Sequence, residues 1–260
     1  MNTPTLDDDH ERRFGGLERL YGDGARLALH RSHVAVIGVG GIGSWAAEAL
    51  ARSGIGNLTL IDMDHIAVSN VNRQIHALDS TLGQAKVQAL ENRIREINTA
   101  CKVHVVDDFL SEENLAQTIP TDTFDFVIDA CDDARAKAPL VAHAYRHKIP
   151  LVVCGAAGGK SDPLKLRVAD IGRTTHDALM TRVKDRLRRY HNMRPHRNGK
   201  FGVTCIFLDE PSKRNSACTT GKLSCAGYGS VVTITATMGF AAASLCLKRI
   251  IAVHKEKIDA

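Results

Sequence analysis

The hydrophobic positions of the chain fall into short apolar runs separated by segments of helical periodicity. His33–Ile37 and Asn57–Ile61 are apolar runs with the composition of strands buried in a parallel sheet. Between them, residues 41–53 place their apolar side chains, including Trp45 and Leu50, on one helical face. Strand, helix and strand together predict a βαβ unit of about thirty residues.

The same alternation continues to residue 154. A helix is predicted over residues 84–97, with Val87, Leu90 and Ile94 facing inward. Further strands are expected at residues 103–106, 124–128 and 151–154, with another helix at residues 134–147. Strands that alternate with helices predict the α/β class, with a doubly wound, Rossmann-like and mostly parallel sheet.

The pattern changes in the second part of the chain, where basic residues become frequent and one apolar run, residues 201–208, predicts a further strand. We expect a single domain over residues 1–260. Residues 10–160 would form its alternating half and residues 161–260 a C-terminal elaboration of the same fold.

Residues 226–247 need a separate decision because they run for 22 residues without a charge, which is long enough to cross a membrane. Much of their apolar character comes from alanine, and eight of the positions are Gly, Ser or Thr, which weaken insertion into a bilayer. We interpret the stretch as a loop followed by a buried helix and expect no stable membrane insertion.

Composition bears on location more than on fold. Hydrophobic residues make up 44% of the chain and charged residues 24%, which are ordinary values for a globular protein. The seven cysteines are scattered and form no C-x-x-C pair, and the polar residues 1–10 lack the apolar core of an export signal. Unpaired cysteines without such a signal predict a cytoplasmic protein.

The most specific motif is Gly38-Val-Gly40-Gly41-Ile-Gly43, which follows the first strand and opens the first helix. In such a loop one glycine allows the tight turn, one lets the backbone approach a phosphate, and one lets helix and strand pack closely. The helix N-terminus offers N–H groups and a positive dipole end to the anion. Asp62 ends the second strand, where a carboxylate accepts hydrogen bonds from a ribose. These residues predict a nucleotide site but do not specify the nucleotide.

A second polar group extends the prediction from binding to chemistry. It consists of Asn70, Asn72, Arg73, Gln74 and Lys86, together with Asp129 and Asp132 at the end of the central strand. Breaking a bond at phosphorus spreads negative charge that fixed cations and a metal must neutralise. Lys86 and Arg73 can supply positive charge, and Asp132 can hold Mg²⁺ against the phosphates.

These motifs resemble the adenylation signature of the MoeB/ThiF/ubiquitin-activating superfamily. The matching segments are Gly38 to Gly43, Asp62-x-Asp64, Asn70-x-x-Arg73-Gln74, Gly83-x-x-Lys86 and Asp129-x-x-Asp132. The similarity is clearest over residues 10–160. It implies the attack of a carboxylate on the α-phosphate of ATP, which gives an acyl-adenylate and pyrophosphate.

The resemblance also implies a role for each matching residue. ATP would be held by the glycine loop and by the side chains of Asp62, Asp64, Asn70, Gln74 and Lys86. Asp62 would bind the ribose, and Asn70, Gln74 and Lys86 would hold the phosphates. Arg73 would reach the nucleotide of a partner subunit, which makes a homodimer the default expectation. Asp132 would be the carboxylate linked to Mg²⁺, with Asp129 as a further candidate ligand.

The chain departs from many members of that superfamily in its cysteines. Those members carry two C-x-x-C pairs that bind a structural Zn²⁺, and this chain has none, so we predict no structural zinc. Cys205, Cys218 and Cys225 are candidates for a thioester-forming residue. Cys225, at the start of a glycine-rich stretch, is the first that we would test.

Within the superfamily, the chain most resembles the bacterial tRNA threonylcarbamoyladenosine dehydratases. The missing zinc pairs, the length, and the stretches Arg13-Phe-Gly-Gly-Leu17, Arg26-Leu-Ala-Leu29 and Asp129-Ala-Cys-Asp-Asp133 carry this resemblance. The implied activity is ATP-driven cyclisation of the threonylcarbamoyl group on the adenosine next to the anticodon. Its carboxylate would be adenylated, and an internal nucleophile would then displace AMP.

A basic stretch at residues 173–200 agrees with a tRNA substrate, because it holds nine Lys or Arg residues against two acids. Each contact between such a residue and a phosphate releases condensed counterions. The candidates for tRNA binding are Arg182, Lys184, Arg186, Arg188, Arg189, Arg194, Arg197 and Lys200. Tyr190, His191 and His196 lie among them and can stack on bases.

Two alternatives stay open at this point. An activator of a ubiquitin-like sulfur-carrier protein would keep the adenylation chemistry and act on a C-terminal glycine. Separately, a cysteine desulfurase or sulfur-acceptor system is a candidate partner of this chain. An NAD-dependent oxidoreductase, or a nucleotide-sensing module without catalysis, would need only the glycine loop. Lys86, Arg73 and Asp132 would then have no evident task.

Overall fold

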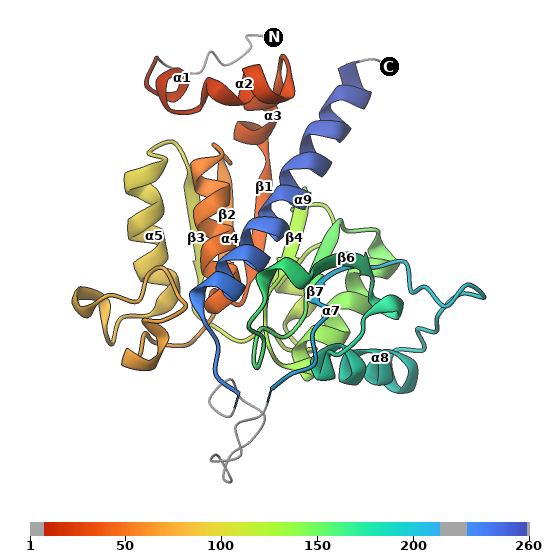
Figure 1. The fold of residues 1–260 in the computed structure, drawn as a ribbon. Helices are drawn as coiled ribbons and strands as arrows, with labels where there is room; N and C mark the ends of the chain where they lie inside the picture. The colour runs from red at the N-terminus through yellow and green to blue at the C-terminus, as the bar shows by residue number, and fades with distance from the viewer. Residues whose placement is uncertain (1–7, 214–227, 259–260) are drawn as a thin grey trace.

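The computed structural model describes residues 8–213 and 228–258 (Figure 1). The strands in these ranges are β1 (His33–Ile37), β2 (Asn57–Ile61), β3 (Lys102–Val106), β4 (Phe126–Asp129), β5 (Leu151–Cys154), β6 (Leu166–Asp170) and β7 (Thr204–Leu208). The α-helices are α1 (Asp8–Phe14), α2 (Gly16–Tyr21), α3 (Ala25–Arg31), α4 (Gly41–Arg52), α5 (Lys86–Ile97), α6 (Leu115–Thr118), α7 (Ala134–His147), α8 (Ala178–Tyr190) and α9 (Val232–Ile258).

The strands form one sheet in the order β3-β2-β1-β4-β5-β7-β6. Neighbouring strands are parallel except β6 and β7, which are antiparallel. The predicted doubly wound, mostly parallel sheet is therefore confirmed. The order reverses between β1 and β4, and at such a switch point the loops leaving the carboxyl ends of the two strands part and open a crevice for a ligand.

The alternation of side chains along the strands builds two layers of helices. Val34 and Val36 of β1 belong to one buried cluster with residues of α4, α5 and α9. Ala35 and Ile37 of the same strand face the opposite way and pack in a cluster with residues of α6 and α7. Both faces of the central strand are thus covered, as expected for an apolar run in a parallel sheet.

The largest departures from the predicted elements lie at half-exposed or irregular segments. The helix expected over residues 84–97 begins at Lys86, because the carbonyl of Gln84 accepts a hydrogen bond from Ile66 at 2.9 Å. Strand β6 was not predicted, because its side chains are only half-buried or exposed and it lacks an apolar run. The helices α1, α2 and α3 were likewise not part of the prediction.

Helix α9 contains residues 232–247 of the uncharged stretch and is, by length and composition alone, apolar enough to cross a membrane. In the fold, however, it packs against α4 and lies beside β4 and β5 (Figure 1). A Cβ at Gly239 would lie 2.5 Å from the carbonyl oxygen of Ile42, so glycine allows the two helices to approach closely. Buried residues of α9 recur every four positions, at Ile234, Met238, Ala242 and Cys246. The helix is a core element, as the buried-helix interpretation requires.

Candidate functional site

The glycine loop joins β1 to α4 at the switch point of the sheet. Gly38 has a φ of +76°, and a Cβ there would lie 2.9 Å from the backbone of Cys131, in the loop after β4. A Cβ at Gly43 would overlap the carbonyl oxygen of Gly38. At Gly40, by contrast, a Cβ would meet only the side-chain amide of Gln74, at 3.8 Å. The loop is closed towards the fold and open at Gly40, which suits the approach of a phosphate.

Asp62 follows β2 and braces the same loop. One carboxylate oxygen accepts the N–H of Val39 at 2.8 Å, and the other accepts the N–H of Asp64 at 2.9 Å. Burial raises the pKa of Asp62, and the ammonium of Lys86, 4.0 Å away, opposes this shift. Because each oxygen has a second lone pair, the carboxylate can hold the loop and still accept hydrogen bonds from ribose hydroxyls.

Lys86 is the first residue of α5, and only 5% of it is exposed. Its Nζ lies 2.6 Å from Oδ2 of Asp64, whose side chain is 63% exposed. Because the Asp64 side chain is largely exposed, water screens part of the attraction between the two groups. An incoming phosphate can therefore replace Asp64 as the partner of this lysine.

The segment that follows residue 69 carries two of the predicted side-chain amides, and one of them, that of Gln74, lies at the glycine loop. Asn70 is buried, and its side-chain oxygen accepts the N–H of Ala67 at 3.0 Å. Gln74 is also buried; its amide nitrogen is the closest atom to the open side of Gly40. Its Oε1 has no hydrogen-bond partner within the described part of the chain. Gln74 thus lies at the open side of the loop, and its role in binding a phosphate stays a prediction.

Two residues that were not among the predicted site residues fix the backbone of Arg73. Nε1 of Trp45 and the hydroxyl of Thr235 donate to the Arg73 carbonyl at 3.0 and 2.9 Å. The guanidinium donates to the carbonyl of Ser69 and to the side chain of Asn72. The sequence held a signal for Trp45, because the indole N–H of a partly buried tryptophan usually finds a hydrogen-bond acceptor. Thr235 lies too far along the chain for a local pattern to find it.

The loop after β4 carries the two predicted acidic residues, and the structure separates them. Asp132 is exposed, whereas the side chain of Asp129 is fully buried. Oδ1 of Asp129 lies 2.8 Å from Nζ of the equally buried Lys137. Asp129 is therefore buried and paired with a lysine, whereas a metal ligand was expected to face the crevice. Lys137 was missed, although it lies on the helical face of Ala134 and Val141, which the apolar pattern marks as inward.

His76 is a further buried residue of this region that the sequence prediction missed. It is 2% exposed, and neither ring nitrogen has a hydrogen-bond partner within the described residues. Burial, followed by the charge of Lys86, lowers the pKa of His76 to about 4. The ring is therefore neutral at pH 7 and adds no positive charge beside Lys86.

The cysteines that the structure describes are poor candidates for a nucleophile. Cys205 is fully buried in β7, and burial raises the pKa of its thiol well above the usual value. The thiol of Cys131 is shifted in the same direction, again by burial and then by the charge of Asp129. A thiol held in its protonated form reacts slowly. Cys218 and Cys225 lie outside the described residues.

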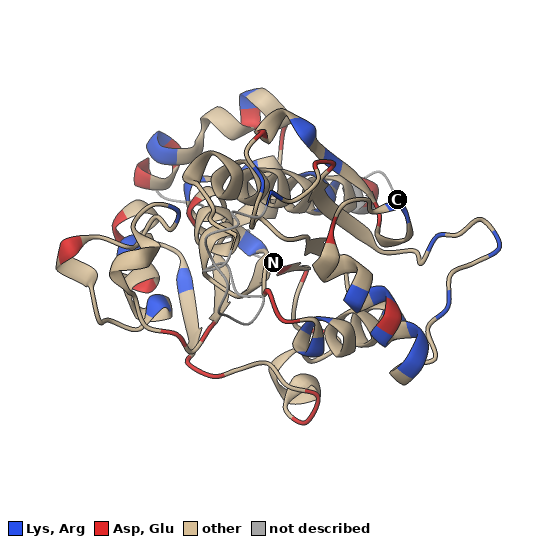
Figure 2. Cartoon of the chain, turned by 60° about the horizontal axis from the view of Figure 1, so that its bottom comes forward, with Lys and Arg blue, Asp and Glu red and all other residues tan. Residues whose placement is uncertain are grey.

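The residues expected to bind tRNA lie on α8 and on the projecting loop that follows it (Figure 2). Arg182, Arg188, Arg189, Arg194, Arg197 and Lys200 are exposed, and Lys184 and Arg186 are half-buried. The Asp170 carboxylate holds the end of this loop by accepting the N–H groups of Phe201, Gly202 and Val203 at 2.7 to 3.1 Å. For this reason the strand expected from residue 201 begins only at Thr204. We call α8 and this loop, residues 178–200, the basic face.

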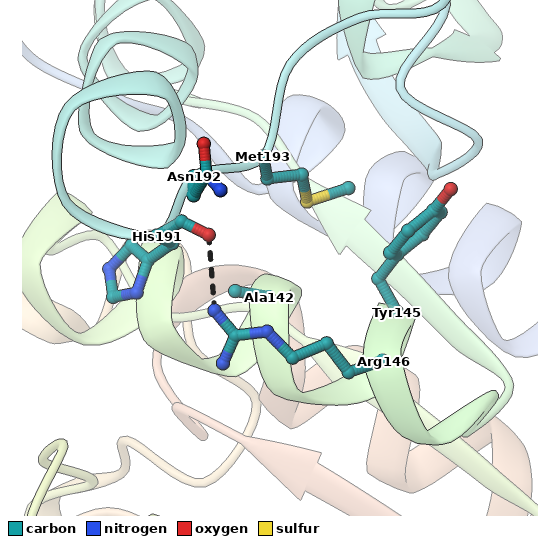
Figure 3. A pocket seen from close by; sticks show the side chains of 6 residues that line it. All are labelled: Ala142, Tyr145, Arg146, His191, Asn192 and Met193. Carbon is teal, nitrogen blue, oxygen red and sulfur yellow. Dashed lines mark hydrogen bonds between the residues drawn. The ribbon is translucent and has the colours of Figure 1, made fainter.

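A pocket of about 120 Å³ adjoins the basic face (Figure 3). It is lined by Ala142, Tyr145, Arg146, His191, Asn192 and Met193. Nη2 of Arg146 donates to the carbonyl of His191 at 3.1 Å and closes one side. Helix α7 begins at the crevice and has 14 residues, so its other end, where the pocket lies, is about 20 Å away. The pocket is separate from the nucleotide crevice.

Comparison with known proteins agrees with this geometry. The sequence matches the ThiF family over residues 16–259. It is 44% identical to the tRNA threonylcarbamoyladenosine dehydratase of Escherichia coli (strain K12), over 95% of this chain and 96% of that protein. The crystal structure of E. coli TcdA in complex with ATP is similar with a TM-score of 0.90, at 43% identity, over 97% of this chain and 99% of that one. The E. coli molybdopterin-synthase adenylyltransferase is 38% identical over 50% of this chain and 51% of that protein.

Proposed function

The chain belongs to the ThiF family, and from this premise we propose that it is an ATP-dependent enzyme that dehydrates threonylcarbamoyladenosine next to the anticodon of tRNA. The observation that carries the proposal is the 44% identity to the E. coli dehydratase along nearly the whole of both chains. An activator of a ubiquitin-like sulfur carrier has less support, because the similarity to the adenylyltransferase covers 50% of the chain. Docking of a cysteine desulfurase or sulfur acceptor stays a prediction.

The proposed reaction has two chemical steps. A carboxylate oxygen of the threonyl group attacks the α-phosphorus of ATP, the bond from this phosphorus to the bridging oxygen breaks, and pyrophosphate leaves. An internal nucleophile of the same modified nucleoside then attacks the activated carbonyl carbon and loses its proton to solvent. AMP leaves with the former carboxylate oxygen, and a ring closes. The nucleoside thereby loses the elements of water.

We assign the residues of the crevice to the parts of this reaction. The open backbone at Gly40 and the N-terminus of α4 would hold phosphates, and Asp62 the ribose. Lys86 would stabilise the negative charge that develops on the leaving pyrophosphate. Mg²⁺, when bound, withdraws charge from the phosphate oxygens. Among the described residues no cluster of three His, Cys, Asp or Glu side chains can hold a metal ion alone, so the phosphates would share the ion with Asp132.

We propose a homodimer in which Arg73 acts on the nucleotide of the other subunit. Its backbone carbonyl accepts two hydrogen bonds, while its guanidinium is bonded only to neighbouring loop groups. Phe240 of α9 is 48% exposed and contacts Trp45 edge to face, with ring centroids 5.8 Å apart. Val231 and Val232, at the start of α9, are exposed as well. An apolar surface next to Arg73 fits a second copy of the chain.

We place the tRNA on the basic face, and the enzyme in the cytoplasm, where its substrate is found. The exposed arginines and lysines can contact phosphates and release counterions. Tyr190 is 66% exposed and lies beside Arg186, whose guanidinium carbon is 5.0 Å from the ring centroid. Such a pair offers a stacking surface for an unpaired base. The pocket beside Tyr145 continues this surface towards the end of α7.

The proposed activity has a direct test. Purified protein incubated with Mg²⁺, ATP and tRNA that carries threonylcarbamoyladenosine should convert this nucleoside into a cyclic product lighter by one water, with release of AMP. Mass spectrometry of the digested tRNA, with and without ATP, measures the conversion. Unchanged tRNA and no AMP would refute the proposal. Pyrophosphate exchange with a carrier protein ending in Gly-Gly would instead favour the sulfur-carrier alternative.

Lys86→Ala and Asp132→Ala should each lower turnover by about 10²–10³, because each variant loses one stabiliser of charge in the transition state. Steady-state release of AMP with saturating tRNA measures the loss. Lys102→Ala and Asp122→Ala remove the same kinds of side chain at exposed positions and should retain normal rates. Near-normal turnover in the first two variants would show that the assignment of the crevice is wrong.

The cross-subunit role of Arg73 predicts complementation between two inactive variants. Arg73→Ala and Lys86→Ala should each be nearly inactive alone. In a mixed dimer, one site would combine the intact Lys86 of one chain with the intact Arg73 of the other. Random exchange of subunits should then restore about a quarter of wild-type activity. No recovery after verified exchange would place Arg73 in the site of its own subunit.

Charge reversal on the basic face should affect tRNA and leave ATP alone. Arg189→Glu, Arg194→Glu and Arg197→Glu should each raise the KM for tRNA and reduce the slope of log affinity against log salt by about one. The dissociation constant for ATP should not change. Lys248→Glu makes the same charge change at an exposed position of α9 and serves as the control. Equal effects of all four variants would exclude a specific role for the basic face.

A further inference from the structure

A fully buried ion pair lies beneath the crevice, between the end of β4 and α7. Oδ1 of Asp129 and Nζ of Lys137 are 2.8 Å apart, and both side chains are 0% exposed. The same Nζ also donates to the backbone carbonyl of Asp129 at 3.1 Å. Lys137 therefore holds both the side chain and the main chain of the residue that ends the central strand.

Stability alone does not explain such a pair. Removing two charges from water offsets most of their mutual attraction, so apolar side chains of similar size are often equally stable. Burial by itself favours a neutral lysine. The charge and the hydrogen bond of Asp129, together with the neighbouring Cys131 and Cys154, nevertheless raise the pKa of Lys137 above its usual value. The pair contributes a fixed geometry that an apolar contact does not impose.

The turn that carries Asp132 is built around the Asp129 carboxylate. Oδ1 of Asp129 also accepts the N–H of Cys131 at 3.3 Å and the thiol of the same residue at 3.0 Å. On the other side of Asp132, the Asp133 side chain accepts the N–H of Arg135 at 2.9 Å and caps α7. Asp132 stands between two residues whose positions are fixed by hydrogen bonds.

The same turn supports the glycine loop. A Cβ at Gly38 would lie 2.9 Å from the backbone of Cys131, so the two loops are in direct contact. The N–H of Ala130 donates to the carbonyl of Ile37, the last residue of β1, at 2.8 Å. A displacement of the turn would therefore move both the loop and Asp132.

We propose that Asp129 and Lys137 are positioning residues for the adenylation step, which hold Asp132 and the glycine loop in their working arrangement without touching the nucleotide. This inference rests on the proposed function. A small displacement of a group that acts in the transition state costs about 10² in rate. Binding of ATP uses many contacts besides these, so its affinity is much less sensitive. The pair therefore acts on kcat more than on nucleotide binding.

Three variants test whether the pair acts on kcat more than on ATP binding: Asp129→Asn, Lys137→Met, and the double variant Asp129→Asn/Lys137→Met. Each single variant leaves one buried charge without its partner and should lower the melting temperature. Each should also lower the kcat for AMP release by about 10–10², with a change of less than about threefold in the dissociation constant of ATP measured by calorimetry. All rates are measured well below the melting temperature of each variant.

The double variant distinguishes positioning from a merely structural role. It holds no unpaired buried charge, so its melting temperature should recover towards that of the wild type. Its kcat should stay low, because Lys137 no longer holds the end of β4. A kcat that recovers together with the melting temperature would overturn the inference, and so would ATP affinity that falls as far as kcat. A melting temperature that fails to recover would also contradict it.

Glu48→Gln is the matched control, because it disturbs another buried carboxylate that is paired with a basic side chain. Glu48 lies in α4 and accepts from Arg93 of α5 at 2.7 Å. The variant should lower the melting temperature and leave kcat unchanged; a similar loss of kcat would overturn the inference. Failure of the proposed function is recognised separately, because the wild-type protein would then release no AMP with the modified tRNA.

Discussion

The contact between two backbone loops, at the carboxyl ends of β1 and β4, is the constraint on which the rest of the site depends. Gly38 has no side chain to keep the loops apart, and a Cβ there would meet the backbone of Cys131 at 2.9 Å. The turn at Cys131 is in turn held by the Asp129 carboxylate. Because the two strands are neighbours where the winding of the sheet reverses, this contact sets the floor of the crevice.

In the proposed function, the charges around that crevice supply the chemistry. A glycine loop at a switch point suits a dinucleotide as well as a triphosphate, so the fold alone does not assign a reaction. The nearly buried Lys86, the exposed Asp132 and the fixed backbone of Arg73 go beyond what binding requires. Groups that are already oriented need no reorganisation when charge develops on the phosphates. His76, whose pKa burial lowers to about 4, is neutral at pH 7 and adds no positive charge to this arrangement.

Local signals in the sequence predicted the half of the fold that carries the nucleotide site. The bounds of β1, β2, α7 and β5 agree with the predicted ranges, because apolar runs, glycines and helical spacing mark them within a few residues. The antiparallel pairing of β6 with β7 escaped prediction, since β6 is half-exposed and has no apolar run. The same limit applies to the site. Thr235 holds the carbonyl of Arg73 across 162 residues, and Asp129 turns inward because of Lys137, so tertiary packing alone reveals these partners.

In the proposed reaction, the crevice joins a carboxylate of the tRNA to the α-phosphorus of ATP. Labelling both oxygens of the threonyl carboxylate with ¹⁸O tests this claim most directly, because the oxygen that attacks phosphorus stays with AMP when the ring closes. Mass spectrometry of the products should find one ¹⁸O in the phosphate of AMP and none in pyrophosphate. Unlabelled AMP, or ADP and phosphate as the products, would contradict the acyl-adenylate and with it the assignment of the site.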